Sequence, residues 1–191
     1  MKSLYLFTGM IVLLCCPAAQ SQASKNFPTD DEIRLLVTQT DRALTDYSAA
    51  SKQYQGLEET EADAANDKRV IDGLTTMAKG FDAKPQAFNS RFGFEFVLLL
   101  DDASRNASLC YGDAIAKGIK ATMAHNTQIA QDYLQLAQSC TSVSTLLYTI
   151  SENAAALYRR YLDGADALSR QATAELNRCA ETLKKQTEKD K

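Results

Sequence analysis

The sequence predicts an all-α protein, an elongated antiparallel bundle of three long helices with coiled-coil-like packing. Two observations predict this fold class. Apolar residues recur at alternating steps of three and four through most of the chain, which is the pattern of helices that each bury one narrow seam. The chain has 191 residues, no tryptophan and only three prolines, a composition typical of helical proteins rather than of β-sandwiches.

The start of the chain has the features of a signal peptide over residues 1–23. Lys2 supplies the positive charge, and residues 4–16 form an apolar run that is shorter than the roughly 20 residues a membrane span needs. A small residue, Ala23, stands directly before Ser24 and suits cleavage between the two.

Cleavage leaves residues 24–191, which we expect to form a single helical-bundle domain, secreted or periplasmic, with no transmembrane segment. A lipoprotein is less favoured, because the residues before Cys15 and Cys16 are not the small ones that a lipid-attachment box needs. The formal net charge is −3, and loss of Lys2 changes it to −4. This mild acidic balance gives no electrostatic reason to expect nucleic acid as a partner.

The first of three helical arms is predicted over residues 29–80. Thr29 and Glu32 have the spacing of a capping box at a helix start. The apolar seam of this arm is Ile33, Leu36, Thr40, Ala43, Leu44, Tyr47, Ala50, Tyr54 and Leu57, then Val70, Ile71, Leu74, Met77, Ala78 and Phe81. The apolar pattern weakens after Gly56. The arm is therefore either one long helix with a weak point near 56–62 or two helices end to end.

The second and third arms are predicted over residues 86–140 and 144–188. The second begins with the apolar stretch 88–100, which we interpret as helix because no other segment offers a partner strand. Residues 139–145 are mostly serine and threonine, which favour caps and turns, so the hairpin between the two arms is placed there.

The main alternative is a bundle of four or five shorter helices. Gly56 and Gly112 would supply the breaks, because a glycine inside a helix costs about 1 kcal/mol relative to alanine. The nearly equal lengths of the three arms favour three helices, which bury three seams against one another.

Three cysteines remain after cleavage, and they constrain the hairpin. Facing residues of an antiparallel hairpin are symmetric about its turn, and Cys110 and Cys179 have a mean position of 144.5. A bond from Cys140 to either would bridge one predicted helix, on the order of 45 Å, whereas disulfide partners need Cα atoms within about 7 Å. We therefore predict a Cys110–Cys179 disulfide and a free thiol at Cys140. The alternative is that all three are reduced core residues.

Glu95, Asp102 and Arg105 form a candidate polar cluster on one side of the second arm. The functional interpretation is an acid or ligand site with a raised pKa. The simpler interpretation is a structural ion pair of Glu95 with Arg91 or Arg105, because a partly buried carboxylate needs a partner. We favour the ion pair.

No motif for catalysis or for a cofactor occurs in the sequence. His125 is the only histidine, so neither paired Glu-x-x-His motifs nor a haem motif is present, and there is no glycine-rich phosphate loop. We expect no catalytic, cofactor-binding or metal-binding residue. Asn106, Ala107 and Ser108 form a glycosylation sequon.

These features favour an exported, non-catalytic helical protein with a structural, adaptor or chaperone-like binding role in the cell envelope or outside the cell. Its protein partner is unknown, and it is expected to be a monomer or a dimer linked through Cys140. The alternative is a small-molecule or lipid-binding bundle that uses the apolar stretch 88–100.

Protein purified from a cell that exports it is expected to begin at Ser24, because signal peptidase requires a small residue such as Ala23 before its cut. The intact mass measures this directly. Ala23→Phe should abolish or shift the cut, and a wild-type mass that still includes Met1 would contradict the prediction.

Overall fold

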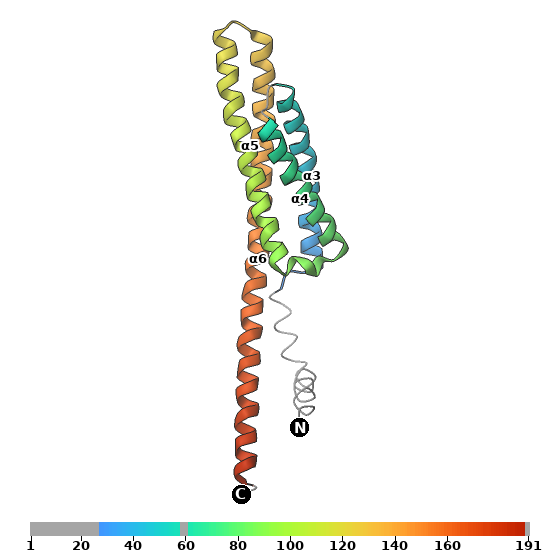
Figure 1. The fold of residues 1–191 in the computed structure, drawn as a ribbon, viewed down its shortest axis with the longest axis vertical. Coiled ribbons are helices and arrows are strands. Elements are labelled where there is room, and N and C mark those ends of the chain that lie inside the picture. The colour runs from blue at the N-terminus through green and yellow to red at the C-terminus, as the bar shows by residue number, and fades with distance from the viewer. Residues whose placement is uncertain (1–26, 58–60, 190–191) are drawn as a thin grey trace. The chain divides into compact units, whose positions relative to one another are not determined.

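A computed structural model gives the structure of residues 27–57 and 61–189. Its elements are α3 (Asp30–Gln55), α4 (Glu61–Ala83), the short 3-10 helix η2 (Pro85–Phe88), α5 (Arg91–Met123) and α6 (Thr127–Lys189) (Figure 1). No strand occurs within these residues. The all-α prediction is therefore confirmed, with four long helices in place of three. The predicted signal peptide, residues 1–23, lies outside the described residues.

The chain divides into two compact units, and α6 contributes to both. The bundle unit consists of residues 29–158, and the described part of the C-terminal unit consists of residues 27–28 and 159–189. The expectation of one domain over 24–191 stays a prediction.

In the bundle unit each helix runs antiparallel to the one before it (Figure 1). The capping box is confirmed: Thr29 N donates to Glu32 Oε2 at 2.8 Å, and Glu32 N donates to Thr29 Oγ1 at 3.3 Å. α3 ends at Gln55, as the weak pattern after Gly56 indicates, but α4 folds back beside α3 instead of continuing it. The Arg34–Asp82 ion pair, at 3.0 Å, joins the two helices.

The second reversal lies at Ala124–Asn126, not at the predicted 139–145. His125 has a φ of 56°, in the left-handed region where histidine and asparagine are enriched among non-glycine residues. Asn126 then caps α6, because its Oδ1 accepts a hydrogen bond from Ile129 N at 3.3 Å. The break predicted as an alternative at Gly112 does not occur, since α5 runs through it.

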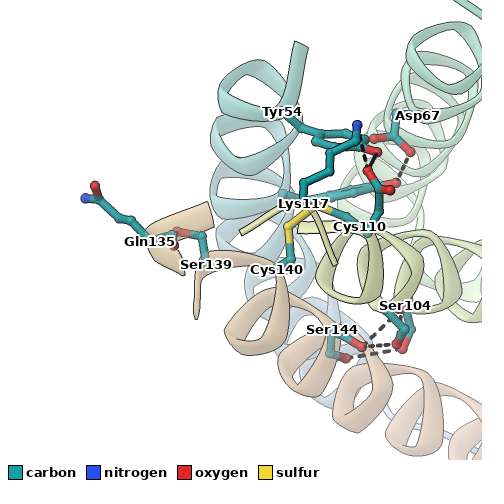
Figure 2. The surroundings of a disulfide bond; sticks show 12 residues. Tyr54, Asp67, Ser104, Cys110, Lys117, Gln135, Ser139, Cys140 and Ser144 are labelled. Atoms are coloured by element: carbon teal, nitrogen blue, oxygen red, sulfur yellow. Dashed lines mark hydrogen bonds and ion pairs between the residues drawn. A yellow bond between two sulfur atoms is a disulfide. The ribbon is translucent and has the colours of Figure 1, made fainter. Parts of the chain in front are cut away.

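Residues 139–145 lie within α6, and the hydroxyl groups of Ser139, Ser144 and Thr145 form hydrogen bonds without a turn. Thr145 Oγ1 donates to Thr141 O at 2.9 Å, one helical turn back. Ser144 faces α5: Ser104 Oγ donates to Ser144 O at 3.2 Å, and Ser144 Oγ donates to Ser104 O at 3.1 Å (Figure 2). The predicted hairpin is therefore an interface between two continuous helices.

The displaced turn corrects the disulfide. The bond joins Cys110 to Cys140, with Cα atoms 6.1 Å apart, and the predicted Cys110–Cys179 bond is wrong. The symmetry rule itself holds, because the mean of 110 and 140 is 125, the observed turn. Cys179 is the free, exposed thiol among the described cysteines, and Cys140 is only 1% exposed. Cys140 therefore has no thiol with which to link a dimer.

The core of the bundle unit is apolar and continuous. Its largest fully buried side chains are Phe88, Phe96, Ile33, Leu36, Leu74, Leu100, Leu136, Leu147, Ile150, Val70, Thr40 and Cys140. Phe81 lies edge-on to both Phe88 and Phe96, with ring centroids 5.4 Å and 5.3 Å apart, a favourable aromatic geometry. The predicted seam of the first arm contributes to this core from Ile33 to Ala50 and from Val70 to Phe81.

In the C-terminal unit, Phe27 packs on α6. Its ring centroid lies 6.0 Å from that of Tyr161, and Arg160 Nη2 donates to Phe27 O at 3.2 Å. A Cβ atom at Gly164 would lie 3.2 Å from the Phe27 ring, so glycine lets the ring approach the helix backbone closely. Phe27 is thereby held against α6.

Leu100→Ala should destabilise the protein by about 2–5 kcal/mol, because Leu100 is fully buried and its loss leaves a cavity. Leu98→Ala is the matched control: Leu98 lies two residues away in α5 but is 49% exposed, and its loss should cost less than about 0.5 kcal/mol. Urea denaturation followed by circular dichroism measures both values. Equal losses would contradict this packing.

Candidate functional site

Polar side chains from several helices of the bundle unit lie around the disulfide (Figure 2). Tyr54, from α3, donates its hydroxyl hydrogen to Asp113 Oδ2 on α5. Lys117, one turn after Asp113, places Nζ 2.9 Å from the same Oδ2 and 5.3 Å from the centroid of the Tyr54 ring. Tyr54, Asp113 and Lys117 therefore form one clamp between α3 and α5 beside Cys110.

A second tyrosine–aspartate pair joins α3 to α4. Tyr47 donates to Asp67 Oδ1, and Asn106 Nδ2 on α5 donates to the same oxygen at 3.1 Å. Asp67 is 9% exposed, and these two donors compensate for its burial. The predicted sequon is thus built into α5, where the Asn106 amide nitrogen bonds Asp67 and Ala107 is buried.

The pKa of Asp113 is set by opposing effects. Burial raises this pKa, but the hydrogen bonds from Tyr54 and Lys117 and the positive charges of Lys117 and Lys120 outweigh burial. The net pKa lies below the ordinary value of 3.8. The side chain is therefore an ionised acceptor near neutral pH, as a cross-link between helices requires.

The structure does not bring the predicted polar cluster together. Glu95 pairs with Arg91, at 3.2 Å, which is one of the two partners expected for it. Arg105 instead pairs with Asp101 at 2.9 Å. Asp102 reaches across to Arg69 on α4 at 3.9 Å, so its ion pair is the only one of the three that joins two helices. These pairs are solvent-accessible, and pairs of this kind contribute little to stability.

The residues that do form the polar interior were only partly visible in the sequence. Tyr47 and Tyr54 are seven residues apart and so share one face of α3. Asp113 and Lys117 have the i, i+4 spacing of a helical ion pair. Nothing in the sequence near Asp67 distinguishes it from the other acidic residues of that segment.

A groove of about 460 Å³ lies along the α5–α6 hairpin near its turn. It is lined by Ala114, Ile115, Gly118, Ile119, Thr122, His125, Thr127, Ala130, Gln131 and Leu134. Gly118 lets the helices approach closely, since a Cβ there would lie 3.4 Å from Tyr133 Cβ. The groove is mainly apolar, and Ile119 and Leu134 on its two walls are more than half exposed.

The apolar stretch 88–100 is divided between core and surface. Phe88, Phe96 and Leu100 are fully buried, whereas Phe92 and Phe94 are about half exposed. The buried residues of this stretch form part of the aromatic core, and its half-exposed residues lie on the surface of α5.

The C-terminal unit carries apolar residues that continue the helical spacing of α6 but are exposed. Leu168, Ala172, Leu176 and Cys179 define what we call the exposed seam. Leu176 is 65% exposed. In the bundle unit, by contrast, residues of α6 at the same kind of spacing, such as Leu147, Ile150 and Ala154, are buried.

Among the described residues, no three histidine, cysteine, aspartate or glutamate side chains are grouped so that they could hold a metal ion. Comparisons of the chain with protein-family models, with curated proteins and with solved structures gave no match. Any function proposed for the protein therefore depends on the chemistry of its own residues.

Tyr54→Phe and Asp113→Asn should each destabilise the protein by about 1 kcal/mol at pH 7, because each removes a hydrogen bond to the ionised carboxylate. The pKa of Asp113 is lower in the folded than in the unfolded state, so its contribution is present above about pH 4 and is lost as the pH falls through the folded-state value. The difference between wild type and Asp113→Asn should therefore shrink toward zero at low pH. Urea denaturation at pH 7 and pH 3 tests this, and a difference that grows at pH 3 would contradict it.

Proposed function

We propose that this protein is an exported, non-catalytic helical adaptor that binds another protein through the exposed seam of α6. The observation that carries the proposal is the contrast between the two parts of one helix. The spacing of apolar residues is maintained throughout α6, but the exposed seam has apolar side chains in water. A helix with one narrow apolar stripe gains its stability by burying that stripe against another helix.

The distribution of charge supports a binding role for this face. Arg170, Arg178 and Glu181 lie on other sides of α6 than the seam, and all three are exposed to solvent. Arg170 pairs with Asp166, and Arg178 pairs with Glu175, so the charged side of the helix is cross-linked along its own surface. The apolar side is thereby left available for a partner.

Export is supported by the leader in the sequence and by the cysteine chemistry. Disulfides persist in secreted and periplasmic proteins and are rare where thiols are kept reduced. The Cys110–Cys140 bond fits the first of these environments. Across the part of the chain that the structure describes, no helix combines the length and apolar character that crossing a membrane would require.

The bundle unit supports an adaptor role because it is cross-linked in several ways. The disulfide joins α5 to α6, the Tyr54–Asp113 pair joins α3 to α5, and the Tyr47–Asp67 pair joins α3 to α4. A protein built in this way is a stable carrier for a binding helix.

A second candidate function is the binding of a small apolar molecule or lipid. The groove near the α5–α6 turn favours it, because its volume of about 460 Å³ lies in the usual range for ligand pockets and its lining is mainly apolar. The site differs from the stretch 88–100 on which the sequence-based alternative rested. Ligand binding in this groove would not depend on the exposed seam, so the two functions can be separated by mutation.

Leu176→Glu should abolish binding of the protein partner, because it places a charge in the centre of the exposed seam. Ala174→Glu is the matched control: it adds the same charge two residues away, on the opposite side of α6. The measurement is capture from the exported proteins of the producing cell by each immobilised variant, quantified by mass spectrometry. At least one protein should be retained about tenfold better by wild type and Ala174→Glu than by Leu176→Glu. Equal capture by all three proteins would contradict the adaptor role.

A further inference from the structure

The groove along the α5–α6 hairpin has a polar end and an apolar end. Four of its lining residues are polar, and they lie at the turn or within one helical turn of it: Thr122, His125, Thr127 and Gln131. Toward the disulfide the lining is apolar, and Ala114 and Leu134 are the lining residues farthest from the turn. Ala114 and Thr122 are eight residues apart, which is about 12 Å along α5. A ligand that fills the groove therefore has an apolar body of about this length and one polar end.

The shape of the groove suits a single alkyl chain. A Cβ atom at Gly118 would lie 3.8 Å from Ala130 O, so small residues form the floor where the two helices come close together. Ile119 on α5 and Leu134 on α6 form aliphatic walls beside this floor, and they are 57% and 53% exposed. A chain lying on the floor would cover apolar surface of both walls, which is favourable in water.

The lining of the groove carries no carboxylate, lysine or arginine among its ten residues. The charged residues of the same helical turns, Lys117, Lys120 and Asp132, do not line it. A charged group placed in the groove would lose water without gaining an opposite charge, and that loss costs free energy. The lining therefore favours a ligand whose polar end is uncharged.

The Thr122 hydroxyl group determines which hydrogen bonds the polar end must form. Thr122 Oγ1 donates to Gly118 O at 2.9 Å, one turn back in α5, so its hydrogen is already used. Its oxygen can still accept a hydrogen bond, whereas Thr127 and Gln131 can each donate and accept. An end that carries hydroxyl groups provides the donor that Thr122 needs and the acceptors that the other two can use. A carboxylate provides acceptors only.

We infer that the groove binds a single-chain amphiphile with an uncharged, hydroxyl-bearing head, with its alkyl chain between Ile119 and Leu134 and its head beside Thr122. This inference rests on the second function proposed above, since it names the class of ligand for the same groove.

The test is an NMR titration of the full mature chain with three amphiphiles of equal alkyl chain length: glycerol monododecanoate, dodecanoate and dodecyltrimethylammonium, each below its critical micelle concentration. His125 is the only histidine and lines the groove, so its imidazole signal reports occupation of this site. The glycerol ester should bind with a dissociation constant at least about tenfold lower than that of either ion. Equal affinity for all three, or tighter binding of an ion, would overturn the inference.

Thr122→Val tests the contact with the head, because it removes the acceptor and nearly preserves the size of the side chain. It should weaken binding of the glycerol ester about three- to tenfold and leave the affinity for dodecanoate unchanged. Thr149→Val is the matched control: Thr149 Oγ1 donates to Thr145 O at 2.9 Å in the same helical pattern, but Thr149 does not line the groove. Equal affinity of the two variants for the glycerol ester would remove the contact with the head.

Leu134→Glu tests the position of the chain, because it places a charge on one wall of the groove. It should abolish the shift of the His125 signal. Leu109→Glu is its control, since Leu109 is 67% exposed on α5 and does not line the groove. Binding that survives Leu134→Glu would place the ligand elsewhere and overturn the inference.

The inference and the function on which it rests fail separately. If none of the three amphiphiles shifts the His125 signal, the groove is not a ligand site and the second proposed function falls with the inference. If all three bind with similar dissociation constants and Leu134→Glu abolishes each, the groove remains a ligand site and the choice of head is overturned.

Discussion

The alignment of α5 with α6 is the constraint on which the bundle unit depends. It is fixed covalently by Cys110–Cys140 and by the reciprocal hydrogen bonds of Ser104 and Ser144. Both pairs are symmetric about the reversal at Ala124–Asn126. A slip of one residue would rotate each helix by about 100° and move core residues such as Leu100 and Leu136 away from the interior. In the chain-entropy model a loop of this length contributes roughly 3–4 kcal/mol, so the disulfide stabilises the only alignment that buries the core.

Much of the fold was predictable from local signals whose physical basis is strong. The Thr29–Glu32 capping box and the weak pattern after Gly56 identified a helix start and a helix end. The seam of the first arm identified most of its buried apolar residues, because one-sided burial imposes the spacing of three and four. In the second arm the pattern did not identify the small buried residues Ala103, Ala107 and Ala114, whose apolar signal is weak. What the pattern could not show was that the chain reverses fully after Gly56, since a break in a helix does not specify the angle between its two parts.

The position of the second hairpin was missed because tertiary contacts outweighed propensity. Residues 139–145 favour turns in isolation, but Ser144 finds its partner on α5 and Thr145 finds its partner one turn back. The observed turn is formed by His125 and Asn126. His125 adopts the left-handed backbone conformation and Asn126 caps α6, and both preferences are weaker sequence signals than a run of serines and threonines. The polar contacts inside the bundle were missed for a similar reason. Asp67 and Asp113 accept hydrogen bonds from tyrosines of another helix, and the sequence around each aspartate does not show these contacts.

The disulfide also has a topological consequence. Cys110 and Cys140 are 30 residues apart, and the chain between them forms a closed covalent ring that contains the exposed turn and the groove. A protease that cuts the chain at His125 opens this ring but releases no fragment, since the sulfur–sulfur bond still joins α5 to α6. A cut of this kind would convert one polypeptide into two linked ones whose core contacts remain in place. In an environment rich in proteases, the most accessible loop of the hairpin could therefore be cleaved without separating the two helices.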